Sequence, residues 1–103
     1  MTTITIEVDA LGRASAARIY EANRAARTRG ILSVWKVYNR PKDYPDSFVA
    51  RRFETGNGKP DAVATADMVT GDLAMIRESM EMCGLYCRPR APSDDPVIVE
   101  SWI

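Results

Sequence analysis

Alternating hydrophobic and polar positions at both ends of the chain, and hydrophobic runs in its middle, predict the strands of this protein. Residues 2–8 (TTITIEV) and 97–103 (VIVESWI) alternate β-branched or aromatic residues with others, which is typical of half-buried strands. Residues 31–38 (ILSVWKVY) are apolar on both faces and predict a central strand, and residues 48–55 (FVARRFET) predict the next. We expect these two to form an antiparallel hairpin with a long connection.

A long helix is predicted between the first two strands. Residues 10–29 are rich in alanine and contain no proline, a composition that favours a helix. Asp9 is a suitable N-cap, and Gly30 suits the position just after the helix. The small or apolar stripe that should face the fold consists of Leu11, Ser15, Ile19, Ala22 and Ala26. The opposite face carries Arg13, Tyr20, Arg24 and Arg27.

A second helix is expected to begin near Asp67 or Thr70 and to end at Gly84. Its apolar stripe follows helical spacing and consists of Leu73, Ile76, Met80 and Cys83. Asp72 suits the first turn, where the helix dipole favours a negative charge. Segments rich in proline, glycine and aspartate then predict loops at residues 39–47, 56–61 and 89–96.

The predicted order is strand, helix, strand, strand, helix, then one or two strands. The simplest fold for this order is a single α+β domain over residues 1–103. It would be a two-layer sandwich, with a mainly antiparallel sheet of four or five strands and two helices on one face. The order β-α-β-β-α-β is the signature of a ferredoxin-like connection, which is therefore the leading topology.

The composition excludes several classes of function. The chain has 103 residues with 14 basic and 14 acidic side chains, so bulk charge does not draw it to polyanions. It contains no histidine, which excludes Ser-His-Asp and Cys-His catalytic sites and zinc sites that use histidine. Carboxylates, lysine and tyrosine are the remaining catalytic groups. We expect a protein that is not an enzyme and has no cofactor.

The sequence also predicts where the protein works. No apolar run approaches the roughly 20 residues of a membrane-spanning helix. The start, MTTITIEVDALGR, lacks the basic region and apolar stretch of a secretory signal. Two cysteines are too few for a disulfide scaffold. We therefore expect a reduced, cytoplasmic protein without a membrane partner.

The main candidates for a binding surface are Lys36, Tyr38, Arg52 and Trp102. If Trp35 and Phe53 face the helices, alternation places these four side chains and Glu100 on the open face of the sheet, and Arg51 on the buried face. Basic residues interleaved with aromatic ones bind single-stranded nucleic acid through phosphate contacts and base stacking. Arg13, Arg24 and Arg27 would add to such a site. The same residue types are enriched at protein interfaces, and this alternative stays open.

Charge is distributed unevenly along the chain. Residues 1–60 carry eleven basic and six acidic side chains, and residues 61–103 carry three basic and eight acidic ones. A chain with this polarity can bind an anion at one end or associate head to tail with itself. The alternative is a solvated surface on which the charges balance across the fold.

The remaining candidates for metal chemistry are weak. Cys83 and Cys87 lie four residues apart, and without histidine a zinc site would need thiolates from two chains. We expect both to be buried, reduced thiols. Asp94 and Asp95 precede Pro96 in a spacing that matches no calcium loop, so we interpret them as turn residues. No metal site is predicted.

Part of the chain resembles a known group of proteins. Residues 31–103 contain W-x-V-Y-x-x-P-x-D-aromatic-P, then F-V-A-R-R-aromatic, and close to the end D-D-P-x-I-V-E. This pattern resembles a family of small uncharacterised proteins encoded by bacterial and bacteriophage genomes. The resemblance implies a compact small domain and a bacterial or phage origin. It assigns no catalytic or binding residue, and residues 1–30 lie outside it.

Together these observations favour a non-enzymatic module for protein interaction or self-association, forming a homo-oligomer. Charge segregation, aromatic residues at strand positions and the lack of a catalytic constellation support this hypothesis. The alternative is a single-stranded nucleic-acid-binding protein that uses the aromatic and basic face of the sheet. A small enzyme that uses carboxylates is the third hypothesis, and it requires a deep pocket.

Overall fold

The computed structural model describes residues 3–56, 58 and 61–103. Within these residues the chain forms two helices and five strands, in the order helix, three strands, helix, two strands. The elements are α1 (Thr3–Thr28), β1 (Leu32–Asn39), β2 (Phe48–Thr55), β3 (Val63–Gly71), α2 (Leu73–Met82), β4 (Cys87–Pro89) and β5 (Ile98–Trp102). The expected α+β class is therefore confirmed.

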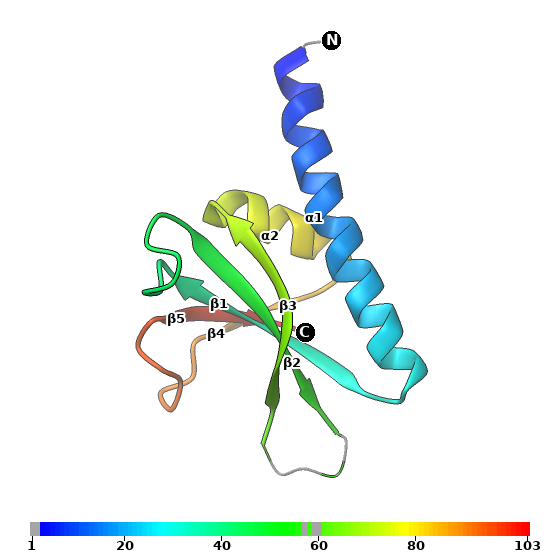
Figure 1. The fold of residues 1–103 in the computed structure, drawn as a ribbon, viewed down its shortest axis with the longest axis vertical. Helices are drawn as coiled ribbons and strands as arrows, with labels where there is room; N and C mark the ends of the chain where they lie inside the picture. The colour runs from blue at the N-terminus through cyan, green and yellow to red at the C-terminus, as the bar shows by residue number, and fades with distance from the viewer. Residues whose placement is uncertain (1–2, 57, 59–60) are drawn as a thin grey trace.

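The strands form one antiparallel sheet in the order β3-β2-β1-β5-β4, and α1 and α2 pack on one face of it (Figure 1). β1 is the central strand, and it pairs with β2 as the predicted hairpin. β1, β2 and β3 follow one another as a meander, and the first element is a helix. This connection differs from the ferredoxin-like one, in which a helix separates the first two strands.

The strand expected at residues 2–8 is wrong, because residues 3–8 form the first turns of α1; residue 2 lies outside the described residues. A helix that has already formed in the alanine-rich segment gains one hydrogen bond for each residue added to it. A strand gains its hydrogen bonds only by pairing with another strand, and β3 and β4 occupy the two edges of the described sheet. The alternation of hydrophobic and polar residues therefore did not determine the secondary structure of residues 3–8.

The second error concerns residues 63–71, which form β3 although we predicted no strand there and expected a helix to begin near Asp67 or Thr70. β3 contains four β-branched residues, which favour a strand, but Ala64, Ala66 and Asp67 interrupt them with residue types that are poor in strands, so the local strand signal is mixed. β3 forms along the edge of β2, to which its residues are hydrogen-bonded. α2 then begins at Leu73, and Asp72 is its N-cap, accepting a hydrogen bond from the Met75 N–H over 2.8 Å.

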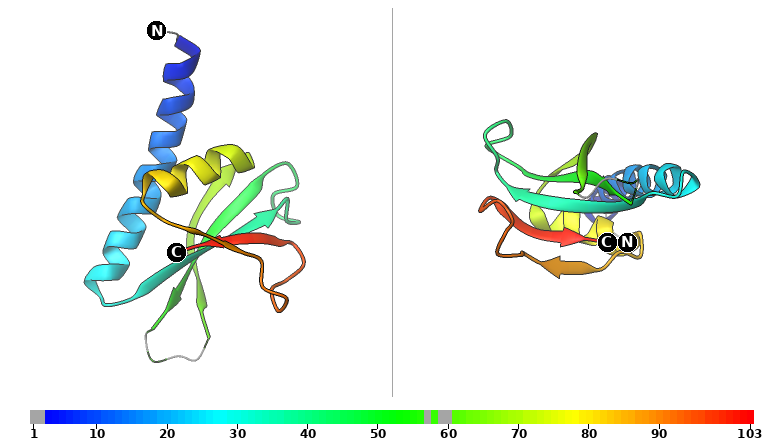
Figure 2. Two further views of the ribbon diagram at one scale, coloured as in Figure 1. Left: turned by 180° about the vertical axis from the view of Figure 1, so that it is seen from behind. Right: turned by 90° about the horizontal axis from the view of Figure 1, so that it is seen from below.

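The core lies between the helices and one face of the sheet. It is built around Trp35 and Val37 of β1, and its other members are Ile19, Ala50, Val69, Ile76, Met80 and Trp102. The predicted stripe of α1 contributes Ile19 and Ala26, which are fully buried; Leu11 lies outside the part of α1 whose side chains are described. α1 crosses α2 closely, and the Ser79 hydroxyl donates to the carbonyl oxygen of Gly12 over 3.3 Å. Figure 2 shows α1 continuing well past this crossing.

Candidate functional site

The face of the sheet that points away from the helices is the candidate site. The pairing register defines it: Lys36 lies opposite Arg51, and Tyr38 lies opposite Val49. Since side chains of paired residues share a face, the register places the following residues on this open face: Leu32, Val34, Lys36, Tyr38, Val49, Arg51, Phe53, Thr55, Ala64, Met68, Thr70, Arg88 and Ser101. Most of these side chains are partly exposed.

The open face carries apolar and aromatic side chains together with three basic ones, Lys36, Arg51 and Arg88. The Lys36 ammonium lies 4.8 Å from the centroid of the Phe53 ring, a favourable cation–π distance. The same ammonium is 3.9 Å from a carboxylate oxygen of Asp94, so the loop between β4 and β5 approaches this face. The open face therefore combines apolar area with charges of both signs.

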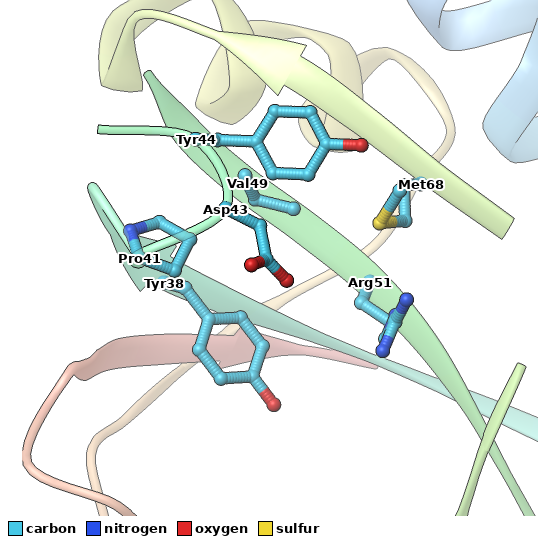
Figure 3. A pocket seen from close by; sticks show the side chains of 7 residues that line it. All are labelled: Tyr38, Pro41, Asp43, Tyr44, Val49, Arg51 and Met68. Carbon is cyan, nitrogen blue, oxygen red and sulfur yellow. The ribbon is translucent and has the colours of Figure 1, made fainter. Parts of the chain in front are cut away.

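A hollow of about 200 Å³ lies at one end of the open face. Its walls are Tyr38 and the loop residues Pro41, Asp43 and Tyr44, and its floor is formed by Val49, Arg51 and Met68. Figure 3 shows the rings of Tyr38 and Tyr44 on opposite sides of the hollow, with the Asp43 carboxylate between them. The hollow thus brings a guanidinium, a carboxylate and two phenols together above an apolar floor.

Arg51 and Tyr38 have unusual surroundings in the hollow. The Nε of Arg51 is buried and has no hydrogen-bond partner in the described part of the chain. A buried donor without a partner is costly, and an acceptor brought by a binding partner would satisfy it. Burial raises the pKa of the Tyr38 hydroxyl, and this effect outweighs the lowering by Arg51. The Tyr38 hydroxyl therefore stays protonated and can donate a hydrogen bond to a bound group.

Two of the four strand residues proposed for binding lie where we expected them. Lys36 and Tyr38 are on the open face. The placement of Arg52 and Trp102 on this face is wrong, because they are 5% and 4% exposed and point toward the helices. Glu100 was expected beside them and is buried as well. The side chains of β2 and β5 therefore point to the opposite faces of the sheet from those expected.

Arg52 is held inside the fold by a polar network. Its guanidinium donates to Asp67 Oδ2 at 2.8 Å, to Glu54 Oε2 at 3.0 Å and to the Ser33 hydroxyl at 3.1 Å. Arg29, just after α1, donates to the same Glu54 oxygen at 2.7 Å. The hydrogen bond from Arg29 has the largest effect on the pKa of the Glu54 carboxyl, followed by that from Arg52, and both lower this pKa. A buried charge needs such partners, so Arg52 has a structural role.

Trp102 and Glu100 belong to a second buried network. Glu100 accepts a hydrogen bond from the Trp102 indole N–H at 2.8 Å. It also accepts hydrogen bonds from the Arg77 guanidinium, and the shortest of these is 2.7 Å. Burial raises the pKa of the Glu100 carboxyl, but the hydrogen bonds from Arg77 and Trp102 outweigh burial and leave the pKa below its usual value. This carboxylate therefore ties α2 to β5.

Arg13, Arg24 and Arg27 lie on the exposed side of α1, as predicted from the helical spacing. That side points away from the sheet, whereas Lys36 and Tyr38 lie on the far side of the sheet. The composite surface expected from these five residues and from Arg52 and Trp102 is therefore not formed. Two separate surfaces take its place.

The sequence did not indicate most of the residues that line the hollow. Tyr44, Asp43 and Met68 come from a loop and from the unpredicted β3. Arg51 was recognised as a notable residue but was assigned to the wrong face. Alternate residues of FVARRFET form two sets, one for each face of the strand, and each set contains one phenylalanine and one arginine. These residue types therefore do not indicate which set faces the helices. Glu54 lies two residues after Arg52 in the same strand, but the second acidic partner of Arg52, Asp67 of β3, is known only from the fold.

The cysteines and aspartates considered for metal binding do not form a metal site within the described residues. Cys83 is half-buried, and Cys87 is exposed, which corrects the expectation that both are buried. The side chains of Asp94 and Asp95 accept hydrogen bonds from backbone N–H groups nearby, which confirms that they are turn residues. No group of three possible metal-binding side chains is found within the described residues. Among the helices described, none is both long and apolar enough to traverse a lipid bilayer.

Comparisons of the sequence with protein-family models and with curated proteins, and of the structure with solved structures, found no match. The resemblance of residues 31–103 to bacterial and phage proteins therefore stays a prediction. The geometry of the site is the basis for the functional proposal.

Proposed function

We propose that this protein is a non-enzymatic interaction module that self-associates through the open face of its sheet. The observation that carries the proposal is the apolar character of this face. The solvated side of an antiparallel sheet is normally polar, yet here Val34, Tyr38, Phe53 and Met68 lie on a face that α1 and α2 leave uncovered. Apolar side chains that stay partly exposed on one uncovered face are typical of interaction surfaces.

The charges on the open face favour a second copy of the chain as the partner. A symmetric dimer uses the same patch on both copies, so the patch must complement itself. Lys36, Arg51 and Arg88 supply positive charge, and Asp43 and Asp94 at the edge of the face supply negative charge. Arg51 of one copy can then meet Asp43 of the second, which supplies the acceptor that its buried Nε lacks within one chain.

The mass of the protein in solution tests this proposal. Sedimentation equilibrium between about 1 μM and 1 mM should show a dimer with a dissociation constant on the order of micromolar. Arg51→Glu places like charges against one another and should weaken the dimer at least about tenfold. Phe53→Asp should have the same effect, since it places a charge in the apolar part of the face.

Arg24→Glu is the matched control, because it makes the same charge change on the exposed side of α1. It should leave the dissociation constant of the dimer within about twofold of the wild-type value. A chain that stays monomeric up to about 1 mM contradicts the proposal. So does an Arg24→Glu variant that weakens the dimer as much as Arg51→Glu.

A further inference from the structure

The exposed side of α1 is a second charged surface, on the other side of the molecule from the open face. Between residues 12 and 28 its exposed charged side chains are four arginines and one glutamate: Arg13, Arg18, Glu21, Arg24 and Arg27. Four arginines and Glu21 give this side a net charge of +3. Glu21 lies 3.7 Å from Arg24, and the two side chains are 67% and 61% exposed, a geometry in which an ion pair is weak.

The arginines form a line rather than a scatter. At 100° per residue, Arg13, Tyr20, Arg24 and Arg27 fall within one narrow stripe of the helix. The stripe extends for roughly 21 Å along α1, at 1.5 Å per residue. Tyr20 lies between the arginines, and 51% of its surface is exposed. An aromatic ring is thus flanked by cations along one edge of the molecule, where Figure 1 shows α1 as the outermost element.

We propose that this stripe, named here the α1 stripe (Arg13, Tyr20, Arg24 and Arg27), binds single-stranded nucleic acid. Guanidinium groups bind phosphate through charge-assisted, bidentate hydrogen bonds. An exposed tyrosine among them offers a stacking surface for a base, and only an unpaired base can use it. The stripe has the length of about six nucleotide steps at 3.4 Å per step, so one strand can contact Arg13 and Arg27 at the same time.

The α1 stripe does not depend on the proposed dimer. The dimer uses the open face, whereas α1 packs on the opposite face of the sheet. In a dimer that joins two open faces, both stripes remain accessible. Binding of nucleic acid and self-association therefore have separate residues and separate tests.

Fluorescence anisotropy of a labelled, mixed-sequence DNA strand of about 20 nucleotides tests the proposal. Three phosphate contacts on a single strand give a slope of about −2 in a plot of log affinity against log salt, so affinity should fall about 20-fold between about 50 mM and 200 mM salt. The Arg24→Gln/Arg27→Gln double variant should reduce the slope to about −0.7. Tyr20→Ala should weaken binding at least about fivefold at constant salt slope.

A double variant that neutralises two exposed cations of the loops, Lys42→Gln/Arg90→Gln, is the matched control. It removes the same charge from sites outside α1 and should change the affinity less than about twofold. Binding that is absent at about 50 mM salt overturns the proposal. Equal losses in the control and in the Arg24→Gln/Arg27→Gln variant do so too, since they indicate attraction by bulk charge.

Two competitors identify the class of ligand. Unlabelled duplex of the same sequence should compete at least about tenfold less well than unlabelled single strand, because its bases are not available to Tyr20. Poly-glutamate should compete weakly. Equal competition by duplex would falsify the single-strand assignment, and equal competition by poly-glutamate would indicate an acidic protein as the natural partner.

Discussion

Two adjacent residues in β2, Arg51 and Arg52, lie in opposite environments. Arg52 is buried among Asp67, Glu54 and Ser33, which accept its hydrogen bonds. Arg51 points to the other face of the sheet, where it forms part of the hollow. The two residues have the same chemistry and differ only in the side of the strand that they occupy.

This contrast gives a prediction for stability. Arg52→Ala removes the arginine that donates to Asp67 and one of the two that donate to Glu54, and it should lower the free energy of unfolding by about 2 kcal/mol. Arg51→Ala should lower it by less than about 1 kcal/mol. Urea denaturation of the two variants measures both values. A larger loss of stability in Arg51→Ala than in Arg52→Ala would show that Arg51, and not Arg52, is the buried arginine of β2.

The carboxylate of Glu100 makes stability depend on pH. Its pKa in the folded protein is lowered by the hydrogen bonds from Arg77 and Trp102, which outweigh the effect of burial. Its contribution is therefore complete above the ordinary carboxyl pKa of about 4.3 and is lost as the pH falls through the lower pKa of the folded state. Glu100→Gln should be less stable than wild type at pH 7, and the difference should shrink below about pH 4.

Urea denaturation of both proteins between about pH 7 and pH 3 measures this difference. Glu54 and the other carboxyl groups titrate in both proteins, so their effects cancel in the comparison. A difference that stays constant down to about pH 3 would contradict a role for the ionised Glu100.

At the scale of elements, the contact between α1 and α2 depends on small residues. Gly12 of α1 lies at the crossing and is buried, but a Cβ placed there would meet its nearest neighbour, Glu78 Oε1, at an ordinary 3.9 Å. The close approach therefore leaves room for a methyl group. Gly84 after α2 is different, because its φ of +75° is disfavoured for residues with a Cβ.

These two glycines should respond in opposite directions to the same change. Gly12→Ala should raise the free energy of unfolding by about 0.5–1 kcal/mol, because alanine favours the helix and meets no clash. Gly84→Ala should lower it by about 1 kcal/mol, because the left-handed conformation is strained for alanine. Thermal denaturation of both variants measures the shifts. A loss of stability in Gly12→Ala would contradict the packing described for the crossing.

At the scale of the whole molecule, the fold separates two surfaces. The open face carries the hollow and most of the outward apolar side chains of the sheet, and the exposed side of α1 carries the arginines. The proposed dimer joins the first surface to its copy, which would place the second surface outward in both copies. Self-association and ligand binding would then be compatible in one assembly.

The symmetry of the proposed dimer can be tested by exchanging charges. If Arg51 of one copy meets Asp43 of the other, Arg51→Glu should dissociate the dimer, and Arg51→Glu combined with Asp43→Arg should recover at least about tenfold of the lost affinity. Sedimentation equilibrium of the wild type, both single variants and the double variant measures the coupling. Additive losses in the double variant would exclude this contact, while leaving the rest of the open face to be tested by Phe53→Asp.

The sequence by itself determined the elements with strong local signals. The hairpin of β1 and β2, the alanine-rich body of α1 and the end of α2 at Gly84 lie where hydrophobic pattern and glycine chemistry predict them. The α+β class follows from the same signals. The exposed arginines of α1 were also predictable, since helical spacing alone separates them from Ile19 and Ala26.

Only the tertiary structure decided the features that depend on partners. Residues 3–8 alternate like a strand but extend α1, because an existing helix can be extended one hydrogen bond at a time. β3 has mixed strand character and forms along the edge of β2. The side of the sheet that Arg51 and Arg52 occupy depends on Asp67 of β3, which pairs with Arg52 together with Glu54 of β2. Hydrogen bonds and ion pairs between distant segments fix these choices, and the local sequence does not contain them.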